Sequence, residues 1–495
     1  MDTKFSKKQA VWFTLINYVG VMIGMVSTLF IYSQDKDLLG IIRFVDGFAQ
    51  IVYPIMVLGA STALLNFQPK LTTYLQRKLF SYSLISIFWM MVFSAIGVSL
   101  VYMLDAYFFK TLKNKEYFIY GFLVAIFLAY VDLFKRQATN LHKLAVPTFY
   151  EKIIPKIALP SVFLLMTYQY VTEQEGLLLY VLSFILMFVA IAVYLLRYFK
   201  PVYTFQYSDL FQSISKKSYY QYSLYAFFAS LGSFFAFRID SLMIPQFLTM
   251  EANGDFNIGV NLANALMIPA TGVFALYSPL ISDALKKNDL SVLKAKYADV
   301  AKNLFFIGII LYGCVVLGMR DFFNLLPTAE KLVPTLPILY ILGANVIINM
   351  ATGFSTEIIA YSKYYRFNLI AILLLAVLNV GLNYVVLSQT NFGIIGVAWV
   401  SLFAMLVFNI SKLLFIYKKL GMVPINQKYL KTIAVSLVLL FIADLLPLMV
   451  LKSFAFVGRC FFFVLSFSFV VYTTGWVQEF NVTLHNILTK FFKFK

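Results

Sequence analysis

Cysteine and histidine are almost missing from this sequence, and their scarcity excludes several kinds of site. The chain has 2 cysteines and 2 histidines among 495 residues. Cys314 and Cys460 both lie inside apolar runs, which is not the arrangement of a disulfide framework or a metal-ligand set. His142 and His485 stand far apart in the sequence, without ligand-like neighbours. We therefore expect no disulfide scaffold, no metal site and no bound cofactor.

Charged residues are also few, and this excludes an ordinary soluble protein. They make up 13% of the chain, whereas 61% of the residues are hydrophobic. Apolar stretches of roughly 20 residues, long enough to cross a bilayer, recur from start to finish. Such spans must be helical because lipid offers no partner for open backbone groups. Runs such as 181–196 do not alternate as the strands of a membrane barrel do.

The sequence predicts an all-α integral membrane protein with about fourteen transmembrane helices. The first apolar run is too long for a signal-peptide core and has no small-residue cleavage site after it, so we expect it to stay as the first span. The outer loops are too short for a soluble catalytic domain. The predicted spans are 10–32, 41–66, 79–104, 117–134, 149–171, 177–199, 219–248, 256–284, 303–319, 335–360, 367–388, 393–417, 429–450 and 455–476.

The net charge of +18 is explained by the positions of the basic residues. With the N-terminus inside, 28 of the 40 Lys and Arg residues fall in the predicted inner segments and 8 in the outer ones. This is the positive-inside bias of a cytoplasmic membrane protein, and it places both termini in the cytoplasm. The excess charge suits attraction to anionic membrane lipids, so no nucleic-acid partner is needed.

Two segments of the sequence resemble each other at an offset of about 214 residues. Each has a glycine at the outer end of a span (Gly40, Gly254) and a proline near its middle (Pro54, Pro269). The match predicts two parallel six-helix lobes, as in many transporters, with two helices appended. The expected domains are 1–210, 211–420 and 421–495, the last ending in an amphipathic tail on the inner surface.

Polar residues at helical spacing indicate either a water-filled cavity or close helix packing. Gly20 and Gly24 in the first span favour packing. For two later spans both readings stay open. Their candidate cavity-lining residues are Asn257, Asn261 and Asn264 in the eighth span, and Asn345 and Asn349 in the tenth, which continues with Gly353 and Glu357 at the same spacing.

Four of the basic residues within spans are candidate site residues, because an unpaired charge there is costly. Arg43 is three residues before Asp46, so the two either pair locally or face the interior. Arg238 and Asp240 point to different faces, and the depth of Arg238 favours the interior. Lys152 and Lys156 share a face and are either cavity cations or positive-inside anchors.

Several acidic residues have neighbours that suggest local pairing. Asp132 is spaced to pair with Lys135 or Arg136, and Glu357 lies within two turns of Lys363. Asp444 has no evident partner in the sequence. The candidates for binding a coupling proton or sodium ion are Asp46, Glu151, Asp240 and Glu357. Membrane potential acting on an anionic cargo is the alternative.

Fixed cations, amides and many tyrosines suit an anionic amphiphile that carries sugar. On residues 237–244 (FRIDSLMI) and 256–263 (FNIGVNLA), and the following helix with Pro269 and Pro279, the chain resembles the bacterial polysaccharide-export (O-antigen type) lipid-linked oligosaccharide flippases. These belong to the multidrug/oligosaccharidyl-lipid/polysaccharide exporter (MOP) superfamily.

The resemblance implies a V-shaped transporter in the bacterial inner membrane, with two lobes around a cationic cavity that opens alternately to each side. It would move a polyprenyl-pyrophosphate-linked oligosaccharide to the outer leaflet, with the lipid tail left in the membrane. Arg238, Arg43, Lys152 and Lys156 would meet the pyrophosphate. The expected partners are this substrate, membrane lipids and other polysaccharide-assembly membrane proteins, and we expect a monomer.

Other functions are weighed against this one. A drug exporter of the same superfamily usually has twelve helices and an acidic cavity, so the appended pair and Arg238 count against it. A lipid II flippase is closer, since it shares fourteen helices and a cationic cavity. A membrane polymerase, ligase or glycosyltransferase needs a sizeable outer loop with catalytic groups, and none is present. The repeat and buried charges disfavour a purely structural protein.

Overall fold

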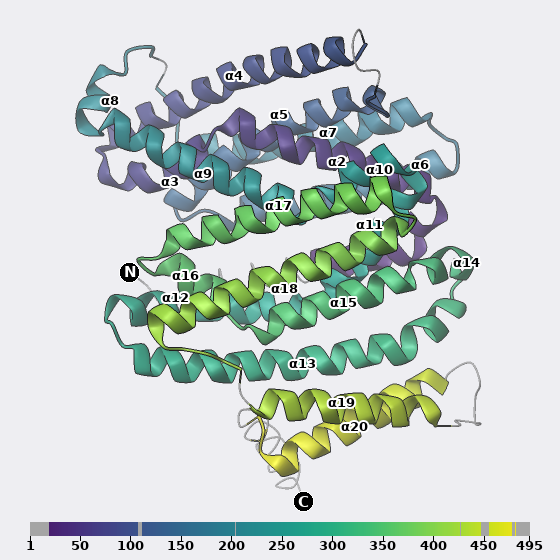
Figure 1. Cartoon of the computed structure of the whole chain (residues 1–495). Helices are drawn as coiled ribbons and strands as arrows, with labels where there is room; N and C mark the ends of the chain where they lie inside the picture. The colour runs from purple at the N-terminus through teal and green to yellow at the C-terminus, as the bar shows by residue number, and fades with distance from the viewer. Residues whose placement is uncertain are drawn as a thin grey trace, which may run out of the picture. The chain divides into compact units, whose positions relative to one another are not determined.

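The computed structural model describes residues 19–106, 111–202, 204–425, 427–446, 455–477 and 481. Over these residues the chain is helical, without a strand (Figure 1). Within this part of the chain ten helices are long and apolar enough to cross a membrane, or eleven if the bent pair α9 and α10 forms one span. A helix occupies the described part of each of the fourteen predicted spans. The predicted all-α membrane architecture is confirmed.

The helices group into two compact units. Unit 1 runs to Asn257 and includes Asn379–Asn391, and unit 2 holds Ile258–Leu378 and the chain from Phe392. The first helices are Val19–Gln34, α2 (Lys36–Val57), α3 (Ala60–Phe67), α4 (Thr73–Leu104), α5 (Phe118–Asn140), α6 (Ala145–Thr167), α7 (Glu173–Leu196), α8 (Ser208–Ser213), α9 (Lys216–Phe237), α10 (Asp240–Phe247) and α11 (Met250–Ala265). Then follow α12 (Ile268–Lys286), α13 (Leu290–Asn324), α14 (Ala329–Leu332), α15 (Leu336–Ala351), α16 (Ser355–Tyr361), α17 (Tyr365–Gln389), α18 (Gly393–Leu420), α19 (Gln427–Leu445) and α20 (Ala455–Thr474).

Two of the sequence predictions fall outside what the structure tests. The predicted domain boundaries after residues 210 and 420 stay predictions. The predicted amphipathic tail lies outside the described residues, apart from Val477 and Asn481.

Four of the predicted spans contain a break in the helix, which the sequence analysis did not predict. The span 41–66 breaks at Leu58 (φ 44°) and Gly59 (φ 73°), both left-handed. A Cβ on Gly59 would lie 1.9 Å from the backbone oxygen of Ser223 in α9, so the break brings two backbones into contact. The span 335–360 breaks at Gly353, whose φ of 55° ends the i→i+4 ladder between α15 and α16.

The other two breaks lie between α9 and α10 and between α11 and α12. The axes of α9 and α10 differ by 49°, with Arg238 and Ile239 between the helices. The second break precedes Pro269, which stands in the first turn of α12 where it has no hydrogen bond to lose. The predicted helices 219–248 and 256–284 are therefore two helices each.

The helices of unit 1 present apolar faces outward, as lipid-facing helices do. Trp89, Phe93 and Ile96 of α4 are more than half exposed, at 64%, 63% and 55%. Near its N-terminal end, α4 is tied to α8 by an ion pair of 2.7 Å between Lys78 and Asp209. The hydrogen bonds from the Lys78 ammonium hold the pKa of the Asp209 carboxyl below its usual value.

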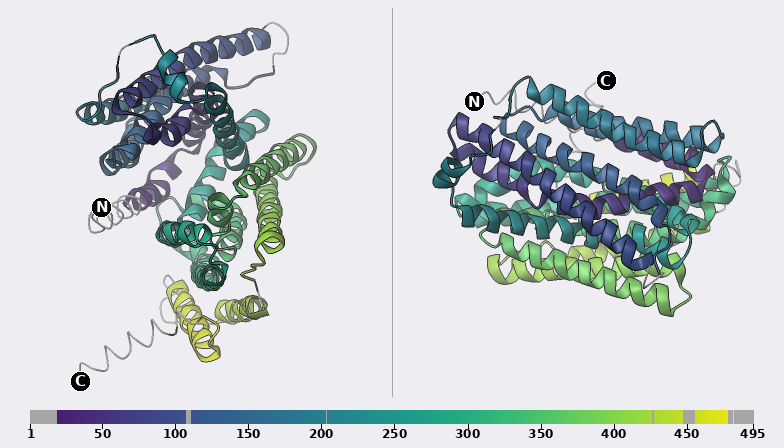
Figure 2. Two further views of the ribbon diagram at one scale, coloured as in Figure 1. Left: turned by 90° about the vertical axis from the view of Figure 1, so that its left-hand side faces the viewer. Right: turned by 90° about the horizontal axis from the view of Figure 1, so that it is seen from above.

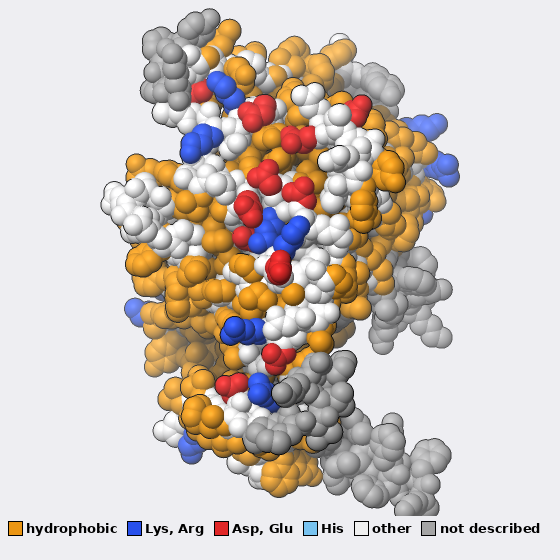
Figure 3. All heavy atoms as spheres, turned by 90° about the vertical axis from the view of Figure 1, so that its right-hand side faces the viewer, with side chains coloured by type: hydrophobic (Ala, Val, Ile, Leu, Met, Phe, Trp, Pro, Cys, Tyr) orange, Lys and Arg blue, Asp and Glu red, His pale blue; other side chains and the backbone are white. Residues whose placement is uncertain are grey.

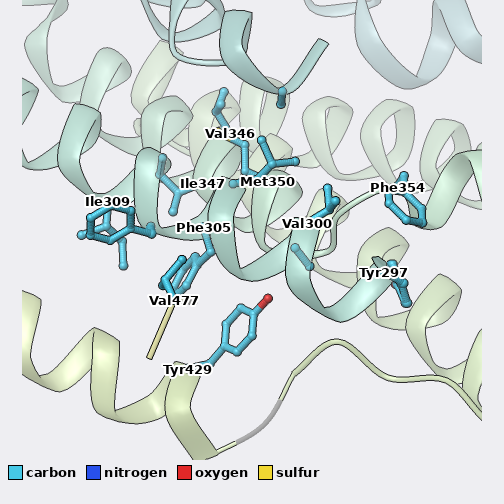
Figure 4. Close-up of a cluster of buried hydrophobic side chains, with 14 of the residues drawn as sticks. Tyr297, Val300, Phe305, Ile309, Val346, Ile347, Met350, Phe354, Tyr429 and Val477 are labelled. Atoms are coloured by element: carbon cyan, nitrogen blue, oxygen red, sulfur yellow. The ribbon is translucent and has the colours of Figure 1, made fainter. Parts of the chain in front are cut away.

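In unit 2 the two appended helices pack against each other and against α13 (Figure 2). The rings of Phe305 and Tyr429 stack with centroids 4.9 Å apart, and both lie in the buried cluster of Figure 4. A Cβ on Gly313 of α13 would lie 2.2 Å from the ring of Phe463 in α20. One helix turn on, a Cβ on Gly318 would lie 3.1 Å from the sulfur of Cys460. Gly313 and Gly318 thus leave space on the surface of α13 in which side chains of α20 pack.

Candidate functional site

The charges of α2 are paired with each other. Arg43 Nη1 lies 3.2 Å from Asp46 Oδ2, so the ion pair expected from their spacing is present. Tyr180 of α7 donates its hydroxyl to the other oxygen of Asp46 at 2.6 Å. The Arg43 Nε atom is buried without a hydrogen-bond partner. This arginine therefore keeps a free N–H donor beside its carboxylate.

The lysines of α6 lie against the glycines of the first helix. A Cβ on Gly24 would lie 2.9 Å from Lys156 Nζ, and one on Gly20 would lie 3.9 Å from the carbonyl oxygen of Lys152. The glycine stripe thus packs on α6, as its pattern favoured, and it leaves room for an ammonium group. Both lysines are half-buried. Neither forms an ion pair with any residue that the structure describes.

Arg238 stands at the break between α9 and α10. Its side chain is exposed and forms no ion pair within the described ranges. Its charge acts on Lys156 of α6 and on Tyr53 of α2, and Lys156 also feels Arg43, Lys152 and Asp46. The four cations predicted as substrate-binding residues therefore lie within electrostatic range of one point in unit 1.

Asp240 is the first residue of α10, on the other side of the same break. It is 8% exposed and accepts a hydrogen bond of 2.6 Å from the side chain of Asn383 in α17. One turn earlier in α17, Asn379 donates to the carbonyl oxygen of Ala236 near the end of α9. Asn379 therefore supplies a hydrogen bond to a carbonyl oxygen at the end of the broken helix, whereas Asn383 binds the carboxylate of Asp240.

The remaining oxygens of these amides are buried without partners. Asn379 Oδ1 and Asn383 Oδ1 receive no hydrogen bond from the described residues, so these two amides and the carboxylate of Asp240 place three oxygen-bearing side chains beside one helix break. Oxygen atoms of this kind suit a proton or a hard cation. Sequence reasoning missed both asparagines, although their i, i+4 spacing is the signal it used for Asn257 and Asn261.

The other predicted acids of unit 1 are engaged in ion pairs. Glu151 lies 2.6 Å from Lys135 of α5. Asp132 lies 3.4 Å from Arg136 and accepts a hydrogen bond from Ser61 of α3. The local pairing predicted for Asp132 is confirmed.

The five asparagines predicted as cavity lining differ in their surroundings. Asn257 is 7% exposed and donates to Asn253 at 2.9 Å, which is a packing contact. Asn261, Asn345 and Asn349 are half-buried, and Asn264 is exposed. The predicted stripe from Asn345 to Glu357 does not run along one helix, because the break at Gly353 places Glu357 on α16.

In unit 2 the charges find partners that sequence spacing did not suggest. The charge next to Glu357 is that of Lys412 in α18 rather than Lys363. Lys412 was counted among the inner-loop cations, but it is 1% exposed. Asp444 lies 3.8 Å from Arg459 of α20.

At the predicted outer end, α2 and α11 meet through a reciprocal pair of glycine contacts. A Cβ on Gly40 would lie 1.9 Å from the backbone oxygen of Met250, and a Cβ on Gly254 would lie 1.9 Å from that of Lys36. Met250 and Gly254 each stand 214 positions after Lys36 and Gly40. The two copies of the repeat thus touch through the same surface, which supports the internal symmetry inferred from the sequence.

Polar contacts reinforce this outer contact. Lys36 pairs with Asp255 at 2.7 Å, and Asn253 donates its side-chain amide to the carbonyl oxygen of Gly40 at 2.8 Å. Figure 3 shows acidic side chains gathered on this end of the molecule. The charges of Glu173 and Glu251 act on Asp37 there. No group of Cys, His, Asp and Glu placed to hold a metal ion occurs in the described part of the chain.

Comparisons with known proteins identify the fold. No protein-family model and no curated protein sequence matches the chain. Among solved structures, it is similar to the inward closed conformation of the lipid II flippase MurJ. That match has a TM-score of 0.72 at 14% identity and covers 97% of this chain and 100% of the other.

Two transporters of the MOP superfamily are also similar. An inward-facing multidrug-resistance MATE transporter gives a TM-score of 0.59 at 14% identity, over 83% of this chain and 94% of the other. A MOP transporter from Pyrococcus furiosus, described as having a binding pocket of reversed polarity, gives 0.57 at 15% identity, over 84% and 96%. At these identities the similarity establishes the fold alone, which the chain shares with these three proteins.

Proposed function

We propose that this chain is a flippase that moves a polyprenyl-pyrophosphate-linked oligosaccharide from the cytoplasmic to the outer leaflet of the bacterial inner membrane. It works by alternating access, as a monomer, and supplies the outer leaflet during synthesis of a cell-surface polysaccharide. The proposal extends the MOP fold to a lipid-linked sugar. It assigns the chain no enzymatic activity, because translocation needs no bond to be broken.

The observation that carries the proposal is the convergence of charge on Lys156. Three cations act on it, and one carboxylate, Asp46, offsets them. Like charges held together in an apolar protein are costly unless an anion completes the site. A pyrophosphate supplies two adjacent negative groups and several acceptor oxygens, so it is suited to bind Lys156, Arg43 and Arg238 together.

A lipid II flippase is the second candidate, favoured by the similarity in fold to MurJ over nearly the whole chain. Its cargo has the same polyprenyl-pyrophosphate anchor and differs in carrying a peptide on its sugar. A MATE-type exporter of cationic drugs is less suited, because the cluster around Lys156 would repel a cationic cargo.

For coupling we assign Asp240, which binds a proton or sodium ion together with Asn379 and Asn383. Among the acids considered, Asp46 and Glu151 are already engaged by Arg43 and Lys135. Asp240 is buried, and its neighbours supply two unpartnered oxygens at a helix break. A cation bound there neutralises the carboxylate and joins α10 to α17, which links occupancy to the bend between α9 and α10.

The test is lipid flipping in proteoliposomes that contain a fluorescent polyprenyl-pyrophosphate-linked disaccharide. Lys156→Met and Arg238→Met should each lower the rate about tenfold or more, since a hydrogen bond to a charged group is worth roughly 1.5–3 kcal/mol. Lys287→Met is the matched control, because that lysine is 70% exposed and paired with Asp283. Unchanged flipping in both variants would refute the cationic site.

Mass spectrometry of lipids that co-purify with the chain separates the two candidates. A pyrophosphate-linked oligosaccharide without peptide supports the polysaccharide substrate, and one with a peptide supports lipid II. Recovery of neither, together with transport of a cationic dye, would favour the drug exporter.

A further inference from the structure

A buried lysine in unit 2 is not used by the proposed mechanism. Lys412 of α18 is 1% exposed, and its ammonium donates one hydrogen bond, to the hydroxyl of Thr356 at 2.9 Å. The ring of Phe408 lies 4.1 Å from the same nitrogen. An ammonium group has three N–H donors. Within the described residues no carboxylate approaches Lys412 closely enough to form an ion pair.

The acid that acts on Lys412 is Glu357, next to Thr356 in the first turn of α16. It is half-buried and stands four residues after Gly353, whose positive φ separates α16 from α15. The carboxylate thus acts on the ammonium without forming an ion pair with it, from a short helix that follows the break at Gly353. Such a carboxylate can gain a proton when it moves away from the ammonium and lose it on approach.

The other groups around this pair are polar but uncharged. Tyr297 of α13 feels the charge of Glu357, and its buried hydroxyl has no hydrogen-bond partner. Ser355 also has an unpartnered hydroxyl. Asn409, three residues before Lys412 on α18, is 1% exposed with both amide atoms unpartnered. Unpartnered atoms of this kind suit water molecules that carry a proton to a buried acid.

The 214-residue offset of the sequence repeat relates this pair to a different kind of contact in the first half of the chain. The positions 214 residues before Glu357 and Lys412 are Lys143 and Tyr198. In unit 1 these two form a cation–π contact, with the Lys143 nitrogen 3.8 Å from the ring centroid. Tyr198 is 52% exposed, so that contact is cheap to make. The second half instead buries a charge at the same place, which lowers stability unless it serves a function.

We propose that Glu357 and Lys412 form a proton-binding site in unit 2, separate from Asp240. One proton from water forms an O–H bond on the Glu357 carboxylate when α16 draws away from Lys412. The bond breaks when α16 returns, and the proton goes back to water while the ammonium stays charged. The site gives the transporter a second point at which proton uptake changes helix packing. Its use in a transport cycle rests on the proposed function, whereas its existence does not.

The test reads protonation directly, without any substrate. Infrared difference spectra of the purified full-length protein, taken between about pH 5 and pH 9, report protonated carboxyl groups by their carbonyl stretch. We expect a band that Glu357→Gln removes and Asp240→Asn leaves in place. Lys412→Met should move the midpoint of this band to higher pH, because the carboxylate loses the nearby cation that favours its charged form.

Controls separate protonation from folding. Lys143→Met changes the equivalent position of the first half and should leave the band unchanged. Thr356→Val keeps both charged residues and should shift the midpoint of the band, which covers the case in which Glu357→Gln fails to fold. Spectra in which Glu357→Gln matches the wild type would overturn the site. A chain that shows the band but flips no lipid retains the site and loses the proposed function.

Discussion

The reciprocal glycine contact between α2 and α11 makes a quantitative prediction about Gly40→Ala and Gly254→Ala. Each new methyl group would begin 1.9 Å from a backbone oxygen, whereas Cβ contacts under 3.0 Å essentially do not occur. The two helices must therefore separate by about 1 Å. Overpacking of this kind typically costs about 1–3 kcal/mol. Because each 1.4 kcal/mol is about a factor of ten, the open outer contact should become about 5- to 140-fold more populated.

The assay measures how fast a buried cysteine in this contact reacts with a membrane-impermeant maleimide. The reporter is Leu39→Cys, since Leu39 is 0% exposed, in a background with Cys314→Ala and Cys460→Ala. Either glycine substitution should raise the labelling rate about tenfold or more. The mechanism also predicts that the doubly substituted chain labels little faster than the single variants, because one separation relieves both clashes.

Two controls show whether the change is local. Gly97→Ala adds the same methyl group where nothing lies within 4 Å, so labelling should not change. Val52→Cys, a buried reporter further along α2, should stay protected in every variant unless the whole helix loosens. Equal labelling of Leu39→Cys in the Gly40→Ala, Gly254→Ala and Gly97→Ala backgrounds would refute the idea that this contact controls opening.

Three further substitutions test other contacts. Gly24→Leu should displace the Lys156 ammonium, because even the Cβ of the new side chain would lie 2.9 Å from the Lys156 nitrogen. We expect the rate of lipid flipping to fall at least as far as in Lys156→Met. The amount of folded protein on size-exclusion chromatography should stay the same. Asn383→Leu removes the hydrogen bond of the buried carboxylate at the α9–α10 break, and should lower the free energy of unfolding by about 1–3 kcal/mol in denaturant titration, unless a cation or proton takes its place. Asp209→Asn should lower the melting temperature at neutral pH. Lys78 lowers the pKa of the Asp209 carboxyl in the folded state, so the ionised carboxylate stabilises the fold at pH values above its ordinary pKa of about 4. This stabilisation is lost as the pH falls through the pKa of the folded state. The melting temperatures of the variant and the wild type should therefore converge in acid.

The lengths of the apolar runs in the sequence predicted the positions of the helices well, because the bilayer sets the length of a span regardless of tertiary contacts. It did not locate the breaks. Pro269 marks one break, but Gly353 and Leu58 act through a left-handed backbone that depends on neighbouring helices. An apolar run reads the same whether or not its helix is continuous.

The sequence also did not predict which side chains pair between helices that are distant in the chain. The Arg43–Asp46 pair follows from spacing within one helix, and it was one of the two alternatives that the sequence left open. The partners of Lys412 and Asp444 come from other helices, and no local pattern identifies them. Asn379 and Asn383 carried a usable signal, but their role depends on a bend in α9–α10 that the sequence did not reveal.

The notched surface of α13 has a consequence for shortening the chain. The side chains of Phe463 and Cys460 pack into the space left by the missing side chains of Gly313 and Gly318. In a chain truncated after α18, these two glycines would face lipid acyl chains. The acyl chains are too mobile to replace the packing contacts of Phe463 and Cys460. Helices α19 and α20 are therefore part of the packing of unit 2. A version of the protein with only twelve helices would need larger side chains on α13 in place of these glycines.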